Sequence, residues 1–140
     1  MRKNLRPENL GDLLDRPLVA TLATYRRGRE ALLSPVWHEW RDGGFDIVIG
    51  RSDIKAEHVR RDPRASVVLY ENEPPYRGIE VRGKGRLTDE GLAEARRRIW
   101  QRYLGVGPLG DDSAEIILRV EGEIRAWDFV DDFGRFMEQA

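Results

Sequence analysis

The sequence contains no cysteine and only two histidines, His38 and His58. The first absence excludes disulfide bonds, thiolate chemistry and metal sites with sulfur ligands. The two histidines lie in different predicted elements with no neighbouring ligand pattern, so no protein-bound metal is expected. No apolar run approaches the roughly 20 residues needed to cross a membrane, and the basic N-terminal segment lacks an apolar signal-peptide core. We therefore expect a cytoplasmic protein with no membrane partner.

A surplus of charge of one sign is also missing. The 140 residues carry a net charge of −1, which argues against a general nucleic-acid partner. The motifs G-x-S-x-G and H-E-x-x-H, the P-loop and the Rossmann fingerprint are absent, so hydrolase and common nucleotide sites are not indicated. Gly83 and Gly85 lie inside a strand pattern instead, where they predict a bulge or a close backbone approach.

Alternating apolar residues and turn signals predict a mainly β protein. Helices are expected over Asn9–Asp15, over Ile54–Asp62 and, after a Thr88 cap, as far as Leu104. Strands are expected over Leu18–Thr24, Ala31–Trp40, Phe45–Ile49, Ala65–Tyr70, Tyr76–Leu87 and Glu115–Phe129. This pattern predicts an α+β fold, with six mainly antiparallel strands closed into a small barrel, as one domain over residues 1–140. Side chains fill so narrow a barrel, so a large ligand must bind outside it, in a groove between protomers.

The start of the predicted helix after Gly50 carries an unusual charge. Ser52 is a good N-cap, yet Lys55 occupies the third helical position, where a glutamate would offset the partial positive charge of the helix end. Backbone N–H groups, the Ser52 hydroxyl and the cations Arg51 and Lys55 converge there after a strand, and together they make a seat for a phosphate group. The alternative interpretation is a lysine that points into water.

Three segments carry a resemblance to a known family: LATYRRGREALLSPVW, IGRSDIKAEHVRRDPRASVVLY and YRGIEVRGKGRLTD. They resemble the pyridoxamine-phosphate-oxidase-like split β-barrel superfamily, and within it the small oxidoreductases that use the deazaflavin coenzyme F420. The match covers Leu18 to Asp89, and its most specific part is KAEHVRRDPRA, from Lys55 to Ala65. The resemblance implies a homodimer of split barrels with the cofactor at the interface. It also implies hydride transfer from the reduced cofactor to a small unsaturated substrate.

The resemblance further implies which residues bind the cofactor. Its phosphate is expected at Arg51, Ser52 and Lys55, next to Ile49 and Gly50. Its ring system is expected against Ser34, Pro35, Val36 and Trp37, and the partner's cofactor against Tyr76, Arg77 and Gly78. Pro35 removes one donor from a strand ladder and so marks an edge or a bulge, where backbone N–H groups can face a ring. The alternatives are that Pro35 only bends an edge strand, that Trp37 is ordinary core and that Tyr76 simply begins a strand.

Several alternatives for the function stay open. FMN presents a phosphate to the same seat and is the alternative cofactor. A non-enzymatic flavin- or haem-binding protein is a second class of function, and haem would require His38 or His58 to be exposed in the groove as an axial ligand. Arg60, Arg61 and Arg64 either hold a polyanionic cofactor tail or form a solvated helix face. No residue is assigned as a catalytic base, because the cofactor carries the chemistry.

Overall fold

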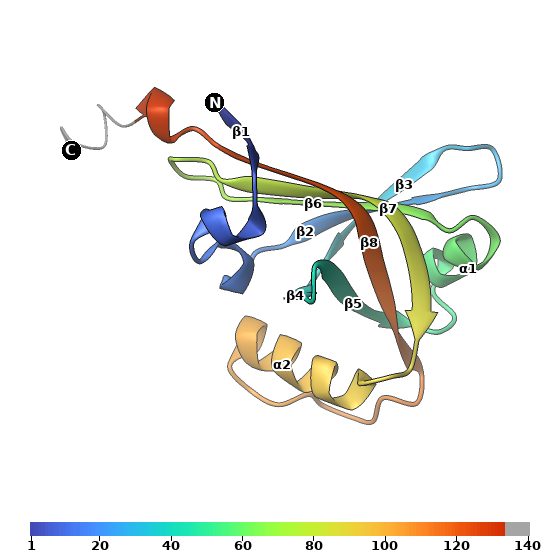
Figure 1. Cartoon of the computed structure of the whole chain (residues 1–140). Coiled ribbons are helices and arrows are strands. Elements are labelled where there is room, and N and C mark those ends of the chain that lie inside the picture. The colour runs from blue at the N-terminus through green and yellow to red at the C-terminus, as the bar shows by residue number, and fades with distance from the viewer. Residues whose placement is uncertain (134–140) are drawn as a thin grey trace.

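The computed structural model describes residues 1–133 as a curled sheet with a few helices (Figure 1). The strands are β1 (Arg2–Leu5), β2 (Ala20–Tyr25), β3 (Ala31–Val36), β4 (Glu39–Arg41), β5 (Gly44–Gly50), β6 (Arg64–Tyr70), β7 (Gly78–Thr88) and β8 (Glu115–Asp128). The α-helices are α1 (Ile54–Arg61) and α2 (Leu92–Leu104), and two short 3-10 helices, η1 (Pro7–Leu10) and η2 (Leu13–Asp15), precede β2. The mainly β architecture expected from the sequence is confirmed.

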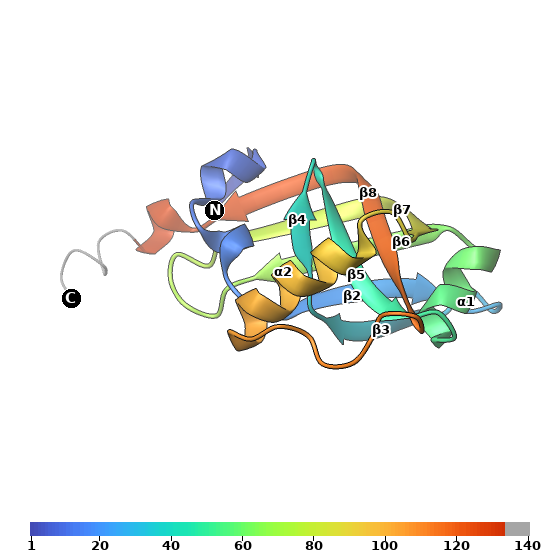
Figure 2. The same cartoon turned by 90° about the horizontal axis from the view of Figure 1, so that it is seen from below.

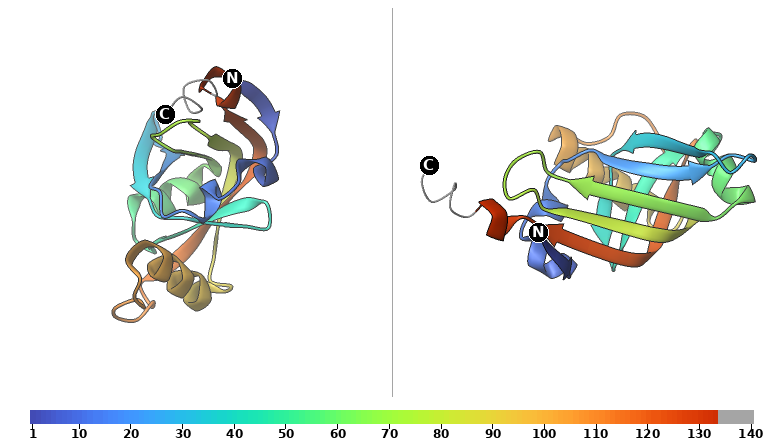
Figure 3. Two further views of the ribbon diagram at one scale, coloured as in Figure 1. Left: turned by 90° about the vertical axis from the view of Figure 1, so that its left-hand side faces the viewer. Right: turned by 90° about the horizontal axis from the view of Figure 1, so that it is seen from above.

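Within the described residues, every pairing of the sheet is antiparallel. The strand order is β3-β2-β6-β7-β8-β5-β4, and β1 pairs with the end of β8. The sheet curls into a half-barrel, which is seen from below in Figure 2 and end-on in Figure 3. Helix α1 closes one end of the curl, where it contacts β2, β5 and β7, and α2 packs on the outside of β5 and β8.

Residues 1–133 form eight strands, where the sequence predicts six. The predicted strand over residues 31–40 is divided into β3 and β4, because Trp37 and His38 leave the ladder. The His38 N–H donates instead to the hydroxyl of Tyr103 at 3.2 Å. The short strand β1 has no signal in the sequence, because its residues are mostly polar and it gains its order from pairing with β8.

Two helix boundaries also differ from the prediction. The segment Asn9–Asp15 is not one helix, because Gly11, with a φ of +59°, separates η1 from η2. Helix α2 begins at Leu92 behind a cap at Gly91, whose φ is +74°. Thr88 is therefore not the cap, and its hydroxyl accepts a backbone N–H in the turn before the helix.

The hydrophobic core fills the inside of the curl. Alternate residues of β2 point inward, and Ala20 and Leu22 are fully buried there. The largest fully buried side chains include Phe45, Leu10, Leu13, Leu22, Ile47, Leu69, Ile79 and Leu118. Because these side chains occupy the interior, a large ligand has to bind at the surface of the curl, as the sequence predicts.

Strands β7 and β8 approach each other closely at a pair of glycines. Gly83 lies opposite Gly122 in the register. A Cβ atom on Gly83 would lie 2.1 Å from the Glu121 carbonyl oxygen, and one on Gly122 would lie 2.3 Å from that of Arg82. Neither position has room for a side chain, so the close backbone approach predicted at Gly83 is confirmed.

Gly122→Ala is expected to lower the free energy of unfolding by about 2 kcal/mol or more, because the added methyl group would overlap the β7 backbone. Urea titration followed by circular dichroism measures the change. Gly107→Ala is the matched control, because a Cβ there has no neighbour within 4 Å. The control is expected to change stability by no more than about 0.5 kcal/mol. Equal stability of Gly122→Ala and the wild type would contradict this account of the close approach between β7 and β8.

Candidate functional site

A hollow of about 520 Å³ lies where the ends of β3 and β5 meet the start of α1. We call it the β3–α1 hollow. Its volume is in the range of small-molecule binding sites. Most of its walls are apolar, and its charged side chains stand at the α1 side and at the start of β8. The lining residues are Val19, Pro35, Val36, Trp37, Val48, Ile49, Gly50, Asp53, Lys55 and Glu115.

Six of the twelve site residues predicted from the sequence line this hollow, namely Pro35, Val36, Trp37, Ile49, Gly50 and Lys55. Strand β3 is an edge strand, as Pro35 predicts. Ser34 does not line the hollow. It is 8% exposed and lies opposite Leu22 in the ladder between β2 and β3, one step further into the sheet than Val36. Trp37 is 37% exposed and is therefore not an ordinary core residue.

The N-cap of α1 is Asp53 and not Ser52, which corrects the prediction from the sequence. The Asp53 carboxylate accepts the Lys55 N–H at 3.0 Å and also lies 3.0 Å from the Lys55 ammonium group. Burial works to raise the pKa of Asp53, but the backbone N–H and the charge of Lys55 outweigh it and hold that pKa below its usual range. The helix start therefore carries its own anion. Lys55 is the second helical residue, and Ser52 is exposed in the turn before it.

Arg51 turns away from the β3–α1 hollow. Its Nε donates to the Ser113 carbonyl oxygen at 3.2 Å, and its guanidinium forms an ion pair with Asp89. Of the three residues predicted to hold a phosphate, Lys55 alone lines the hollow. The side chain of Lys55 is 17% exposed, so its charge is partly shielded from water.

Tyr76, Arg77 and Gly78 lie at the opposite end of the sheet from α1, around the connection between β6 and β7 (Figures 1 and 3). Within one chain they do not join the β3–α1 hollow. Tyr76 packs edge-on against Phe133, with ring centroids 5.3 Å apart. Gly78 has to be glycine, because a Cβ there would lie 2.4 Å from the Trp127 ring.

Arg77 holds the carboxylate of Glu71, which is 2% exposed. The Nε and the backbone N–H of Arg77 both donate to Glu71, at 2.7 Å and 2.8 Å, and Arg16 adds a second guanidinium at 2.9 Å. Burial works to raise the pKa of Glu71, but the hydrogen bonds and charge of Arg77, together with Arg16, hold that pKa below its usual range. The side chain of Arg77 is thus engaged by Glu71 of the same chain.

Sequence reasoning missed four of the residues that line the hollow: Val19, Val48, Asp53 and Glu115. Val19 lies next to β2, which pairs with β3. Glu115 lies opposite Gly50 in the ladder between β5 and β8, and forms an ion pair with Arg96 at 2.6 Å. No local motif marks these two positions, because strand pairings between distant segments create them. Asp53 does carry a signal, since aspartate is a strong N-cap.

Both histidines are buried. His38 is 0% exposed, and burial, helped by the charge of Arg102, lowers its pKa to about 3. His58 is 3% exposed, its Nδ1 lies 3.0 Å from the Thr24 hydroxyl, and burial lowers its pKa as well. Neither side chain reaches a surface groove, so the condition for a haem held by one of these histidines is not met in this structure.

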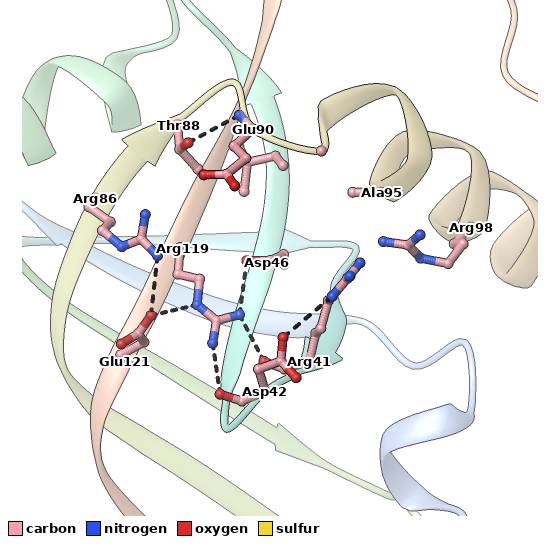
Figure 4. Close-up of a pocket in the computed structure, with 12 residues that line it drawn as sticks. Arg41, Asp42, Asp46, Arg86, Thr88, Glu90, Ala95, Arg98, Arg119 and Glu121 are labelled. Atoms are coloured by element: carbon pink, nitrogen blue, oxygen red, sulfur yellow. Dashed lines mark hydrogen bonds and ion pairs between the residues drawn. The ribbon is translucent and has the colours of Figure 1, made fainter.

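A second hollow, of about 570 Å³, lies between α2 and the outer face of β5 and β8 (Figure 4). At its centre the Arg119 guanidinium donates to Glu121 at 2.6 Å and to Asp46 at 3.2 Å. It also donates to the carbonyl oxygens of Arg41 and Asp42, at 2.8 Å and 3.0 Å. Burial raises the pKa of Asp46 in spite of this partner. Because these groups satisfy one another, we interpret the cluster as a structural tie between β8 and the turn from β4 to β5.

The pyridoxamine 5'-phosphate oxidase family matches residues 7–128 of the chain. The chain belongs to this family. The resemblance carried by the sequence segments is therefore confirmed at the level of the family. Among curated protein sequences, none matches the chain.

Solved structures similar to this member of the pyridoxamine 5'-phosphate oxidase family share its fold at low sequence identity. A conserved hypothetical protein from Mycobacterium tuberculosis is 24% identical, with a TM-score of 0.76 over 89% of this chain and 86% of that one. An F420 reductase is also 24% identical, with a TM-score of 0.71 over 85% of this chain and 98% of that one. A haem-binding protein from Mycobacterium smegmatis is 21% identical, with a TM-score of 0.67 over 88% of this chain and 55% of that one.

Within residues 1–133, no helix is long and apolar enough to span a membrane. The same residues hold no group of three or more histidine, aspartate or glutamate side chains placed to bind a metal ion.

Arg77→Met is expected to lower the free energy of unfolding by about 3 kcal/mol near pH 7, because it leaves Glu71 buried without its main partner. The paired Glu71 contributes this stability fully above its unfolded-state pKa, for which the reference value is 4.5, and loses it as the pH falls through the lower folded-state pKa. The difference in free energy of unfolding between Arg77→Met and the wild type therefore becomes smaller below about pH 4. Urea titrations near neutral pH and at about pH 3.5 measure this difference. The lower pH lies roughly one unit below the reference pKa of Glu71.

Arg82→Met is the matched control on β7, the strand that begins one residue after Arg77. Arg82 pairs with Glu80 at 3.1 Å, and 64% of the Arg82 side chain is exposed. Its loss is expected to change stability by no more than about 0.5 kcal/mol. Equal effects of the two substitutions, or an effect of Arg77→Met that does not depend on pH, would show that Arg77 does not hold Glu71 as described.

Proposed function

We propose that this chain is an oxidoreductase that binds coenzyme F420 in the β3–α1 hollow and transfers a hydride from the reduced deazaflavin to a small unsaturated organic substrate. The observation that carries the proposal is the composition of that hollow, whose apolar walls end at Lys55. Apolar walls suit a ring system, and a lysine at the start of a helix suits a phosphate group. Membership of a family named for an oxidase supports the reaction class.

The residues of the hollow fit such a cofactor in two respects. Pro35, Trp37 and Ile49 offer apolar contact to a ring, and Lys55 offers an ammonium group that a phosphate would share with Asp53 or take over from it. When bound, the reduced deazaflavin supplies the hydride. The residues of the chain would orient the cofactor and exclude water from the side that faces the wall. No residue is assigned as a catalytic base.

FMN is the alternative cofactor, because it offers a ring system and a phosphate to the same residues. A non-enzymatic flavin-binding protein is the second class of function, and binding without turnover would favour it. The anionic tail of F420 would find cations beyond Lys55, since Arg60, Arg61 and Arg64 are exposed at the end of α1 and the start of β6. Similarity in fold to an F420 reductase supports placing F420 first.

Lys55→Ala is expected to weaken cofactor binding by about tenfold or more, the effect of losing one charge-assisted contact to a phosphate. Titration of F420 and of FMN with the protein, followed by quenching of each cofactor's fluorescence, measures the affinities. Lys84→Ala is the matched control, because Lys84 is exposed on β7. Tighter binding of F420 supports the first proposal, and tighter binding of FMN supports the alternative. Binding of neither cofactor, or indifference to Lys55→Ala, would refute the proposed site.

We also propose that the chain acts as a homodimer joined through the outer face of β3, β2 and β6. Among the described residues, no helix crosses the middle of this face, as the view from above shows (Figure 3). Leu33 and Tyr70 face outward there and are 66% and 53% exposed. Val19 and Trp37, which line the β3–α1 hollow, are exposed beside it. Exposed apolar side chains that gather on one face of a sheet are typical of an interface.

The strand register places small and apolar side chains in rows across this face. Thr21 lies between Pro35 and Val68, and the next outward residue of β2 is Ala23. A weakly charged row of small side chains suits contact with a second copy of itself. An isologous contact centred on β2 would bring the Tyr76 end of each protomer to the α1 end of its partner, in keeping with the contact to the partner's cofactor that the resemblance implies for Tyr76.

Leu33→Glu is expected to convert the dimer into a monomer, because it places a charge in the proposed contact. Sedimentation velocity measures the change. The fold is expected to persist, since Leu33 is 66% exposed in the protomer. Leu109→Glu, at a position 77% exposed after α2, is the control that is expected to remain dimeric. A monomeric wild type, or a dimeric Leu33→Glu, would contradict the proposed interface.

A further inference from the structure

Helix α2 holds Trp37 from behind the wall of the β3–α1 hollow. The ring of Tyr103, in the last turn of α2, stacks on Trp37 with centroids 4.8 Å apart and an angle of 10° between the planes. Trp100, three residues earlier, meets Trp37 edge-on at 6.1 Å and 88°. Because Trp37 contacts α2 in these two ways and also lines the hollow, the helix fixes the plane of the indole that faces the hollow.

The hydroxyl of Tyr103 joins two chain segments that lie far apart in the sequence. It donates to the Leu18 carbonyl oxygen at 2.5 Å and accepts the His38 N–H at 3.2 Å. Leu18 immediately precedes Val19, and His38 immediately follows Trp37, so each bonded residue adjoins one that lines the hollow. One hydroxyl therefore links the chain segments that carry two of the walls, although Tyr103 itself does not line the hollow.

We propose that Tyr103 is a positioning residue for the β3–α1 hollow. Its ring sets the plane of Trp37, and its hydroxyl sets the spacing between the walls that carry Val19 and Trp37. This inference rests on the proposed function, because it takes the hollow as the cofactor site. It makes cofactor affinity depend on a residue of α2 that the cofactor does not touch.

Two substitutions separate the two contributions of Tyr103. Tyr103→Phe keeps the stacked ring and removes the hydroxyl, and Tyr103→Leu removes both. The first removes both hydrogen bonds of the hydroxyl and is expected to weaken binding of the preferred cofactor by roughly three- to tenfold, and the second is expected to weaken it by more than that. Leu104→Ala is the matched control, because Leu104 follows Tyr103 on the same helix and is 51% exposed. Fluorescence titration with F420 and FMN measures all three variants.

A signal from Trp37 itself distinguishes positioning from a general loss of stability. The protein is labelled with 5-fluorotryptophan, and the fluorine resonance of Trp37 is assigned with Trp37→Phe. In cofactor-free protein, Tyr103→Leu is expected to shift or broaden this resonance, whereas Tyr103→Phe changes it less and Leu104→Ala leaves it as in the wild type. Thermal unfolding of each variant shows whether it is folded, and Tyr103→Phe decides the matter if Tyr103→Leu does not fold.

Wild-type affinity in Tyr103→Phe, or an unchanged Trp37 resonance in a folded Tyr103→Leu, would overturn the proposal. A lower affinity with no change at Trp37 would also overturn it, because the effect would then not pass through the wall of the hollow. If the wild type binds neither cofactor, the proposed function fails. The Trp37 resonance in cofactor-free protein still shows in that case whether Tyr103 orders this wall.

Discussion

The antiparallel pairing of β7 with β8 is the constraint on which the rest of the sheet depends. This ladder runs without interruption from Gly78 to Thr88, and the other edge of β8 pairs with β5 in its first half and with β1 at its end. Gly83 and Gly122 let the backbones of β7 and β8 come close, so the sheet can bend sharply at this pair of glycines. The bend brings β5 round to the side of β3, and the β3–α1 hollow forms between them.

Local patterns in the sequence predict most of this sheet, because alternation, turn residues and proline act over a few neighbouring positions. Strands β5 and β6 begin and end within one residue of their predicted bounds. The division of residues 31–40 into two strands could not be predicted in this way. It depends on the His38 N–H, which bonds to Tyr103, 65 residues further along the chain.

The residues of the candidate site likewise divide into those that a local motif predicts and those that it does not. Pro35 and Trp37 on β3, and Lys55 on α1, belong to short contiguous motifs, whereas Val19 and Glu115 reach the hollow through strand pairings that no local motif encodes. From the sequence, Lys55 is expected to carry an uncompensated positive charge at the start of the helix. In the structure Asp53 compensates it, so a lysine at this helix start is stable without a ligand. The case for a phosphate therefore depends on the hollow beside Lys55.

The attachment of α2 links the stability of the fold to the hollow. The apolar cluster between this helix and the sheet is small, consisting of Leu92, Ala95, Ile117 and Val48. The ion pair of Arg96 with Glu115 and the stack of Tyr103 on Trp37 add to it. Val48, Glu115 and Trp37 also line the β3–α1 hollow. Because the same side chains form the walls of the hollow and hold the helix, a ligand that orders the walls would also stabilise the packing of α2.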